Sequence, residues 1–246
     1  DVVFTYGRNI RYHSSEYIVS MVKELKERYN IDQATFIDEN LMTMDVASGR
    51  TWLGDVCDLW IKEGLAPNRK NKKRSKTGVY WSGTSHASLH KPEILDKMYE
   101  SGCTHLVYGL ESFDPQILKN LGKGSNRKNN ISSVGICMKS GIIPIPNIII
   151  GFPEETFESI RNTITALIEL GIHAKPHFAT AYPGSEWFYK YKNSIIKQYN
   201  GLLENYILDL GDASNISATI SENFSAIELL GLQELVAKQD LRSLDI

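Results

Sequence analysis

Short apolar runs alternate with amphipathic stretches along most of the chain. The clearest example is the run that stops at Gly151 and Pro153, after which apolar residues recur at helical spacing from Ile160 to Ile168. A buried strand that ends in a glycine turn and continues into a helix is the repeating unit of parallel α/β proteins. The pattern therefore predicts a parallel α/β fold, in which ligands bind at the carboxyl ends of the strands.

The same unit recurs along the chain and predicts five strands, at residues 34–37, 79–82, 105–109, 147–150 and 177–181. Proline at the start of a helix and glycine just after its end predict a helix from Pro92 to Gly102. Asp114 is expected to start a short helix that ends at Gly122. Ser125 is expected to cap a further helix that ends at Gly141 and has Ile131, Val134 and Met138 on one face.

Composition narrows the class of protein. A chain of 246 residues with 42% hydrophobic residues has enough apolar side chains for one sizeable core and at most two domains. Its net charge of −2 gives no reason to expect nucleic acid as a partner. No apolar run reaches the roughly 18 residues that a membrane-spanning helix needs. Three scattered cysteines fit a reducing compartment, so we expect the protein in the cytoplasm.

The order of these motifs resembles the catalytic barrel of radical S-adenosylmethionine (SAM) enzymes, most closely the subclass with a cobalamin-binding domain upstream. The resemblance rests on segments beginning at Gly7, Phe36, Gly102, Asn147, Ala181 and Tyr206. It implies a partial (β/α)6 TIM-like barrel that lacks its first strand. The barrel, from strand two to strand six, would occupy residues 1–190, and a helical extension packed on it would occupy residues 191–246.

The cysteines depart from the pattern of that family. Radical SAM enzymes hold a 4Fe-4S cluster with a Cys-x-x-x-Cys-x-x-Cys loop after the first strand, and Cys57, Cys103 and Cys137 do not have this spacing. Each lies among apolar neighbours, so all three are expected to be small buried side chains. We expect the cluster ligands upstream of Asp1 and expect this fragment alone to be inactive. An enzyme that has lost its cluster is the alternative.

The resemblance implies that four groups of residues bind SAM. Acidic and amide side chains after the second strand would meet the methionine ammonium group, and those after the fourth strand would meet the ribose hydroxyls. The fifth-strand motif would lie against adenine, and the turn after the sixth strand would place backbone groups near its edge. In chain order these residues are Asp38, Glu39 and Asn40; Glu111 and Ser112; Asn147, Ile149, Gly151 and Glu154; and Tyr182, Pro183 and Gly184. Helix caps, core positions and a tight turn remain the alternative interpretation of these residues.

The function implied by the resemblance is enzymatic. A 4Fe-4S cluster cleaves SAM to a 5′-deoxyadenosyl radical, which attacks a small-molecule substrate of unknown identity. An electron donor such as flavodoxin or ferredoxin would be a partner, and cobalamin an additional cofactor through an upstream domain. The alternatives are a cluster-less barrel that acts as a binding or scaffold module, and an unrelated phosphate-binding barrel such as a lyase, whose catalytic lysine or metal carboxylates are not evident.

Two further features are expected to have no catalytic role. His86 and His90 lie in a loop without a glutamate at the spacing of zinc proteases, so we expect ordinary loop histidines and no metal site. The basic run at residues 68–76 contains no aromatic residue that would stack on bases. It is expected to be a solvated loop, with a patch that contacts phosphate or RNA as the alternative.

Overall fold

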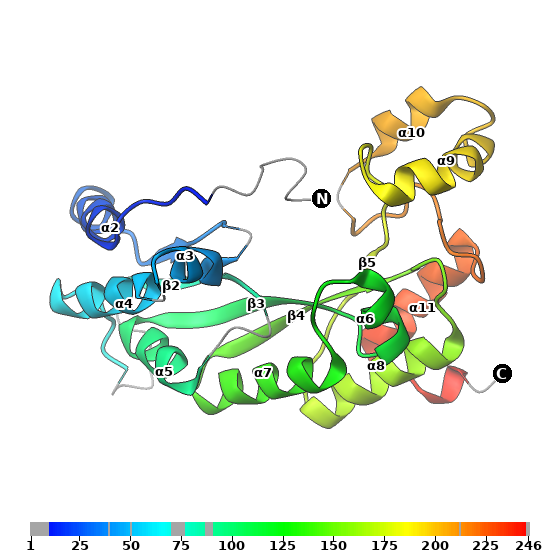
Figure 1. The fold of residues 1–246 in the computed structure, drawn as a ribbon. Helices are drawn as coiled ribbons and strands as arrows, with labels where there is room; N and C mark the ends of the chain where they lie inside the picture. Colours follow the sequence, from blue (N-terminus) through cyan, green and yellow to red (C-terminus); the bar gives the residue numbers. More distant parts are fainter. Residues whose placement is uncertain are drawn as a thin grey trace. The chain divides into compact units, whose positions relative to one another are not determined.

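The computed structural model describes residues 10–38, 40–49, 51–69, 77–86, 91–211 and 213–244. Five strands form a sheet whose order follows the chain, β1-β2-β3-β4-β5, and the pairs β1–β2, β2–β3 and β4–β5 are parallel (Figure 1). The strands are β1 (Gln33–Thr35), β2 (Tyr80–Ser85), β3 (Cys103–Glu111), β4 (Ile143–Ile150) and β5 (His177–Phe178). The predicted α/β class with parallel strands is confirmed.

Helices separate the strands, as expected for parallel strands that need crossover connections. The helices of the described part are α2 (Ser15–Tyr29), α3 (Leu41–Ala47), α4 (Trp52–Lys62), α5 (Pro92–Ser101), α6 (Pro115–Leu121), α7 (Arg127–Lys139), α8 (Phe157–Leu170), α9 (Glu186–Gln198), α10 (Leu203–Asp209) and α11 (Ala226–Lys238), followed by the short η1 (Arg242–Leu244).

Contacts divide the chain into two compact units. Of the described residues, those between 10 and 109 and between 129 and 145 form the N-terminal unit, and those between 110 and 128 and between 146 and 244 form the C-terminal unit. The chain passes from one unit to the other within β3 and β4. The expected division into a barrel and an extension at residue 190 stays a prediction.

Aromatic residues form the centre of the N-terminal unit. The rings of Trp60 and Trp81 lie 6.3 Å apart, and both side chains are buried. Their indole N–H groups donate to the carbonyl of Val79 at 3.2 Å and to Ser101 Oγ at 3.1 Å, so neither polar atom is buried without a partner. Around this centre α2, α3 and α5 all pack against α4 (Figure 1).

The boundaries of α5 and α6 agree with the sequence. Pro92 occupies the first position of α5, and Gly102, with φ of +120°, ends it. Asp114 caps α6 by accepting hydrogen bonds from the backbone N–H groups of Gln116 and Ile117. Gly122, with φ of +60°, ends α6. These positions confirm the predicted helix ends, because proline and glycine act locally.

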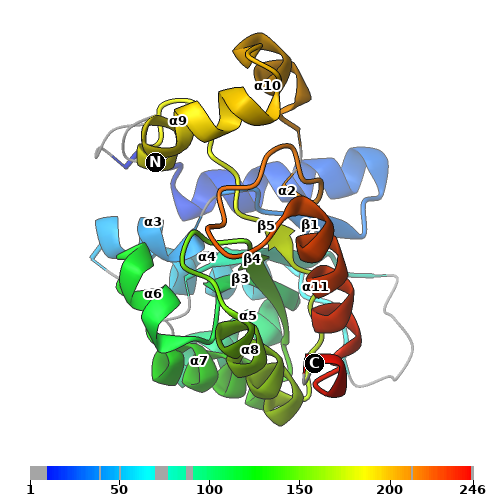
Figure 2. The ribbon, with the colours of Figure 1, turned by 90° about the vertical axis from the view of Figure 1, so that its right-hand side faces the viewer.

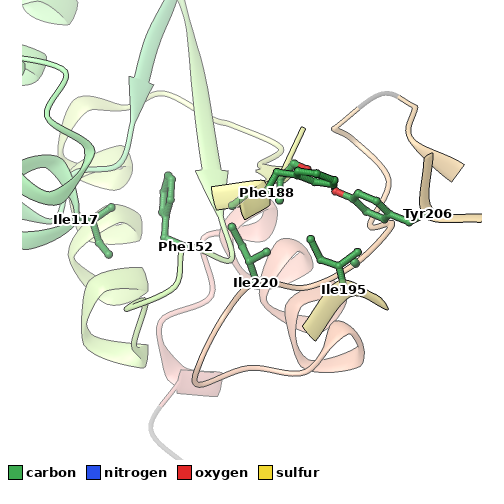
Figure 3. Close-up of a cluster of buried hydrophobic side chains, with 9 residues drawn as sticks. Ile117, Phe152, Phe188, Ile195, Tyr206 and Ile220 are labelled. Carbon is green, nitrogen blue, oxygen red and sulfur yellow. The ribbon is translucent and has the colours of Figure 1, made fainter. Parts of the chain in front are cut away.

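In the core of the C-terminal unit, the chain just after β4 packs against α6, α9 and α10 (Figure 3). Phe152, which follows β4, shares one buried cluster with side chains of α6, α9 and α10. The cluster contains Ile117, Phe152, Ala179, Ala181, Phe188, Ile195, Tyr206, Ala218 and Ile220. Elsewhere in this unit α11 packs along α8 (Figure 2).

Two predicted strands are shorter in the structure than in the sequence pattern. β1 ends at Thr35, and Ile37 is 92% exposed although it belongs to the apolar run. β5 contains only His177 and Phe178. β1 and β5 are the outer strands of the described sheet, and each therefore has a hydrogen-bonding neighbour on one side only.

The predicted apolar face of α7 is buried only in part, at Val134 and, half-buried, at Ile131. Met138 is 45% exposed, whereas Asn130, Ser133 and Cys137 are buried together with Val134. The helix buries polar residues at helical spacing, which an apolar pattern does not reveal. Ser125 does not cap this helix, since its buried hydroxyl has no hydrogen-bond partner among the described residues. Within the described segments no helix is long and apolar enough to cross a bilayer.

Candidate functional site

The end of β3 presents a carboxylate in an unusual backbone conformation. Glu111 adopts φ of +61°, which is uncommon for a residue with a side chain and makes the position a candidate for a functional role. Its Oε1 accepts a hydrogen bond from Lys123 Nζ. Its Oε2 is buried and has no hydrogen-bond partner among the described residues. A buried carboxylate oxygen without a donor costs about 1–3 kcal/mol, so this atom is suited to accept a hydrogen bond from a ligand.

The contact between Glu111 and Lys123 arises from local structure. Asp114 starts α6 three residues after Glu111, and Gly122 ends the helix in the left-handed conformation. The chain therefore turns directly after Gly122 and brings Lys123 back to the end of β3. Lys123 was missed by sequence reasoning, and the only signal for it was its place immediately after a helix-ending glycine.

Ser112 is used for structure. Its side chain is buried, and its hydroxyl lies 3.2 Å from Thr163 Oγ1 of α8 and accepts from the backbone N–H of Asp114 at 3.0 Å. Thr163 Oγ1 also accepts from the backbone N–H of Phe113 at 3.1 Å. This network holds the end of β3 against α8. The expected contact between Ser112 and a ribose hydroxyl stays a prediction.

β4 presents the second unpaired oxygen. Along this strand the side chains alternate, so Asn147 and Ile149 share one half-buried face while Ile148 and Ile150 are buried on the other. The side-chain oxygen of Asn147 is buried and has no partner among the residues that the structure describes. Because β3 and β4 are neighbours in the sheet, unpaired oxygens of Glu111 and Asn147 belong to adjacent strands.

The turn after β4 is organised by Glu155. Gly151 adopts φ of +85°, and its backbone N–H donates to Glu155 Oε2 at 2.6 Å. The N–H of Phe152 donates to the same oxygen at 3.4 Å, and Ser159 Oγ donates to Oε1 at 3.4 Å. Glu155 is 1% exposed. Burial raises the pKa of its carboxyl to about 8, although the hydrogen bonds from Gly151 and Phe152 oppose this shift.

Glu154, the carboxylate that the sequence motif selected, lies in a different environment. It is exposed and lines a small cavity of about 40 Å³ together with Phe152 of the turn and Trp187 of α9. The rings of Phe152 and Trp187 meet edge to face with centroids 5.9 Å apart. Sequence reasoning missed the buried position of Glu155, because the spacing of the motif selects Glu154 and does not show which of two adjacent carboxylates is buried.

The turn after β5 is connected to α10 and to the segment that follows it. The Tyr182 hydroxyl donates to the carbonyl of Gly211 at 3.3 Å, and the preceding carbonyl of Ala181 accepts from the Tyr206 hydroxyl at 2.8 Å. Pro183 is exposed, and Gly184 adopts φ of +90°. The structure thus brings a tight turn to the expected place, and a ligand contact of its backbone stays a prediction.

The residues after β1 belong to the N-terminal unit. Asp38 is exposed, and Glu39 lies outside the described residues. The side-chain oxygen of Asn40 accepts hydrogen bonds from the backbone N–H groups of Met42 at 3.1 Å and His86 at 3.2 Å. Asn40 therefore joins the start of α3 to the end of β2. The expected contact of Asp38, Glu39 and Asn40 with the methionine part of SAM stays a prediction.

The cysteines do not form a metal centre. Cys57, Cys103 and Cys137 are free and buried, as predicted. Burial raises the pKa of the Cys57 thiol to about 12 and that of the Cys137 thiol to about 11. No group of three or more histidine, cysteine, aspartate or glutamate side chains within the described ranges is suited to a metal ion. His90 lies outside those ranges.

The beginning of the basic run packs into the protein. The Arg69 guanidinium lies over the ring of Tyr99 at 4.0 Å and donates to the carbonyl of Cys103 at 2.7 Å. Residues 70–76 lie outside the described residues. A solvated loop at residues 70–76 stays a prediction.

Comparison with known proteins finds relatives that are named methyltransferases. The chain is 29% identical over 197 residues to an uncharacterized methyltransferase from Pyrococcus horikoshii, covering 79% of this chain and 39% of that protein. It is 27% identical over 196 residues to bacteriochlorophyllide d C-12(1)-methyltransferase from Chlorobaculum tepidum, covering 77% of this chain and 39% of that protein. The chain therefore spans about two fifths of the length of these relatives.

Solved structures show the same fold. The radical SAM methyltransferase TsrM from Kitasatospora setae, with cobalamin and a [4Fe-4S] cluster bound, superposes with a TM-score of 0.53 at 16% identity, over 70% of this chain and 31% of that chain. The cobalamin-dependent radical SAM enzyme OxsB superposes with a TM-score of 0.50 at 17% identity, over 64% of this chain and 22% of that chain. Residues 4–167 match the Radical SAM superfamily. Since that match covers more than half of the sequence, the chain belongs to the radical SAM superfamily.

Proposed function

We propose that this chain is the SAM-binding part of a radical SAM enzyme that transfers a methyl group to a small molecule. The observation that carries the proposal is the pair of buried oxygens without partners, Glu111 Oε2 and Asn147 Oδ1, on adjacent strands of a radical SAM barrel. Both atoms are hydrogen-bond acceptors, and SAM offers donors in its ribose hydroxyls and its adenine amino group.

Glu111 is the residue that binds ribose. Lys123 donates to Oε1 and thereby fixes the carboxylate, so that Oε2 is left to accept from a ribose hydroxyl. A hydrogen bond to a charged acceptor contributes about 1.5–3 kcal/mol. Ser112 supports this contact indirectly by holding the end of β3 to α8.

Asn147 and Ile149 are the residues that bind adenine. They lie on the same face of β4, where the amide oxygen of Asn147 accepts from the exocyclic amino group and Ile149 gives an apolar surface to the ring. The turn from Gly151 to Glu154 and the turn at Tyr182, Pro183 and Gly184 border the base. Asp38 and Asn40, with Glu39, act on the methionine ammonium group.

The described cysteines are not suited to bind an iron–sulfur cluster. The described cysteines are buried and their pKa values are raised, whereas cluster ligands are thiolates. This part of the chain therefore supplies no cluster ligands, and the 4Fe-4S cluster of the proposal is a property of the whole protein. When SAM is bound to such a cluster, its cleavage supplies the 5′-deoxyadenosyl radical.

Methyl transfer is the reaction class that the relatives support, because both bear the name methyltransferase. Cobalamin is included as a cofactor because the superposed enzymes are described as cobalamin-dependent or cobalamin-bound. A flavodoxin or ferredoxin as electron donor, and a location in the cytoplasm, stay predictions.

The proposal is tested by titration calorimetry with SAM on the full-length protein that contains this chain, reconstituted with iron and sulfide. Glu111→Gln and Asn147→Ala are each expected to weaken SAM binding by about tenfold, the equivalent of one strong hydrogen bond. Glu204→Gln, which removes a charge from an exposed position on α10, is the matched control and should leave the affinity unchanged.

Equal SAM affinity in all three variants would refute the assignment of the site. A full-length protein that neither acquires a cluster nor binds SAM would instead favour the alternative of a binding or scaffold module.

A further inference from the structure

A segment near the end of the chain contacts the turn after β4. We call residues 221–229 the C-terminal clamp. This segment lies outside residues 4–167, the part that matches the superfamily, so the family match assigns it no role. All of its contacts described below lie within the C-terminal unit.

The clamp binds the backbone of the turn. The backbone N–H of Glu222 donates to the carbonyl of Pro153 at 2.9 Å. The side-chain amide of Asn223 donates to the carbonyl of Glu155 at 2.8 Å. The Glu155 side chain accepts hydrogen bonds from the backbone N–H groups of Gly151 and Phe152 in the same turn. The turn is thus held at both of its ends.

The clamp is itself held in a defined conformation. Ser221 Oγ accepts from the backbone N–H groups of Asn223 at 3.3 Å and Phe224 at 3.2 Å. The Tyr191 hydroxyl of α9 donates to the Glu222 carboxylate at 2.8 Å. Phe224 is buried and packs edge to face on Phe157 with ring centroids 5.0 Å apart. The amide of Asn223 is therefore presented to the turn by a fixed backbone.

The helix α11 begins within the clamp and packs directly on Gly151 through Leu229. A Cβ atom at Gly151 would lie 3.0 Å from Leu229 Cδ1, which is closer than ordinary van der Waals contact. Further along α11, the Gln233 side-chain amide donates to the carbonyl of Pro176 at 2.7 Å, just before β5. The same C-terminal segment therefore supports the chain next to the ends of both β4 and β5.

We propose that the C-terminal clamp is part of the SAM site, and that Asn223 is a positioning residue that fixes the Gly151–Glu155 backbone against the adenosine half of the ligand. This inference rests on the proposed function. Asn223 acts through the carbonyl of Glu155 and does not touch the ligand.

Two variants of Asn223 test the inference in the full-length protein. Asn223→Asp keeps the size of the side chain but removes its N–H donor, and Asn223→Ala removes the side chain. Asn193→Asp introduces the same charge on the exposed face of α9 and is the control. Hydrogen exchange at the amides of Gly151 and Phe152 reports on the turn, and calorimetry with SAM and with 5′-methylthioadenosine reports on the site.

Both Asn223 variants are expected to exchange these two amides faster than the wild type and the control. They are also expected to bind both ligands about fivefold more weakly, because the turn is no longer held in the binding conformation, with an unchanged melting temperature. Methylthioadenosine carries the base and ribose without the amino acid group, so an equal loss for both ligands places the effect on the adenosine half.

The possible failures are distinguishable. If the wild type binds SAM and the Asn223 variants bind it equally well, or if their exchange is unchanged, the inference is overturned and the proposed function stands. If the variants lose affinity only together with melting temperature, Asn223 has a purely structural role and the inference is overturned. If the wild type binds neither ligand, the proposed function fails and the inference fails with it.

Discussion

Glu154 and Glu155 show how strongly the environment separates two identical neighbours. The first is exposed beside a small cavity, and the second is 1% exposed and accepts three hydrogen bonds. Asp114, a nearby negative charge, adds to the effect of burial on the pKa of Glu155. A carboxyl with a pKa of about 8 is largely protonated at neutral pH, so the turn after β4 contains a group that titrates near physiological pH.

The titration of Glu155 gives the first prediction at this scale. Between pH 4.5, the ordinary value, and pH 8 the folded protein keeps a proton on Glu155 that the unfolded chain releases. The folded state then binds more protons, so its stability should fall as the pH rises through this range, by up to about 1.4 kcal/mol per unit. Denaturant unfolding of the wild type and of Glu155→Gln, compared at several pH values, measures this contribution.

The neutral glutamine keeps an acceptor for the amides of Gly151 and Phe152 but does not titrate. The difference in unfolding free energy between the two proteins should therefore change with pH in favour of the variant as the pH rises. A difference that is constant from pH 5 to pH 8 would show that the folded carboxyl has an ordinary pKa.

At the scale of elements, the sequence predicts the end of a helix correctly where a single capping residue determines it. Pro92, Gly102, Asp114 and Gly122 placed the ends of α5 and α6, because capping and left-handed glycines act within a few residues. The five strands and the glycine turn after β4 were also predicted, since a buried strand followed by a helix has a clear pattern.

Contacts between distant segments could not be predicted in this way. Lys123 reaches Glu111 across a helix, and Asn223 reaches Glu155 across 68 positions, and neither pair has a pattern in the sequence. The buried face of α7 was missed for a related reason, because the chain buries Asn130 and Ser133 there. Polar burial depends on partners that only the folded chain brings together.

The packing of Leu229 on the turn after β4 gives a prediction for Gly151. Replacement by alanine requires a side chain at φ of +85°, which costs about 1–2 kcal/mol, and moves Leu229 as well. Gly171→Ala is the matched control, since Gly171 has φ of +66° but open space where the Cβ would lie. Denaturant unfolding should show a larger loss of stability for Gly151→Ala than for Gly171→Ala.

The double variant identifies the cause. Leu229→Ala alone should destabilise by about 2–5 kcal/mol, because it leaves a cavity in the core. In Gly151→Ala with Leu229→Ala the new methyl group enters that space, so the combined loss should be smaller than the sum by about 0.5–3 kcal/mol. Additive losses would mean that the two residues do not meet.

At the scale of the whole molecule, membership of the superfamily implies an iron–sulfur cluster, whereas the cysteines of this chain are not suited to bind one. The chain belongs to a superfamily whose members use an iron–sulfur cluster, and yet its cysteines are buried structural residues. The pKa of Cys103 is raised by burial and by the neighbouring Cys57 and Cys137. Deprotonation of any of them to a ligand would be costly in this environment.

This contrast predicts the outcome of removing the cysteines. Cys137→Ala and Cys57→Ala in the full-length protein should leave the iron and sulfide content per chain unchanged after reconstitution, with only a modest loss of melting temperature. Iron analysis and the visible absorption of the cluster measure the first quantity. A loss of iron in either variant, with the protein still folded, would show that a buried cysteine of this chain is a ligand.

The C-terminal clamp has a consequence for the evolution of this protein. Glu222 and Asn223 donate to carbonyl groups of the main chain, at Pro153 and Glu155. Every amino acid offers such a carbonyl, so the turn can accept substitutions at these positions without losing the contact. Selection for these contacts therefore does not require a substitution in the turn to be matched by a substitution in the clamp. Among homologues we expect no covariation between positions 223 and 155 although the two residues touch, because Asn223 contacts only the main-chain carbonyl at position 155.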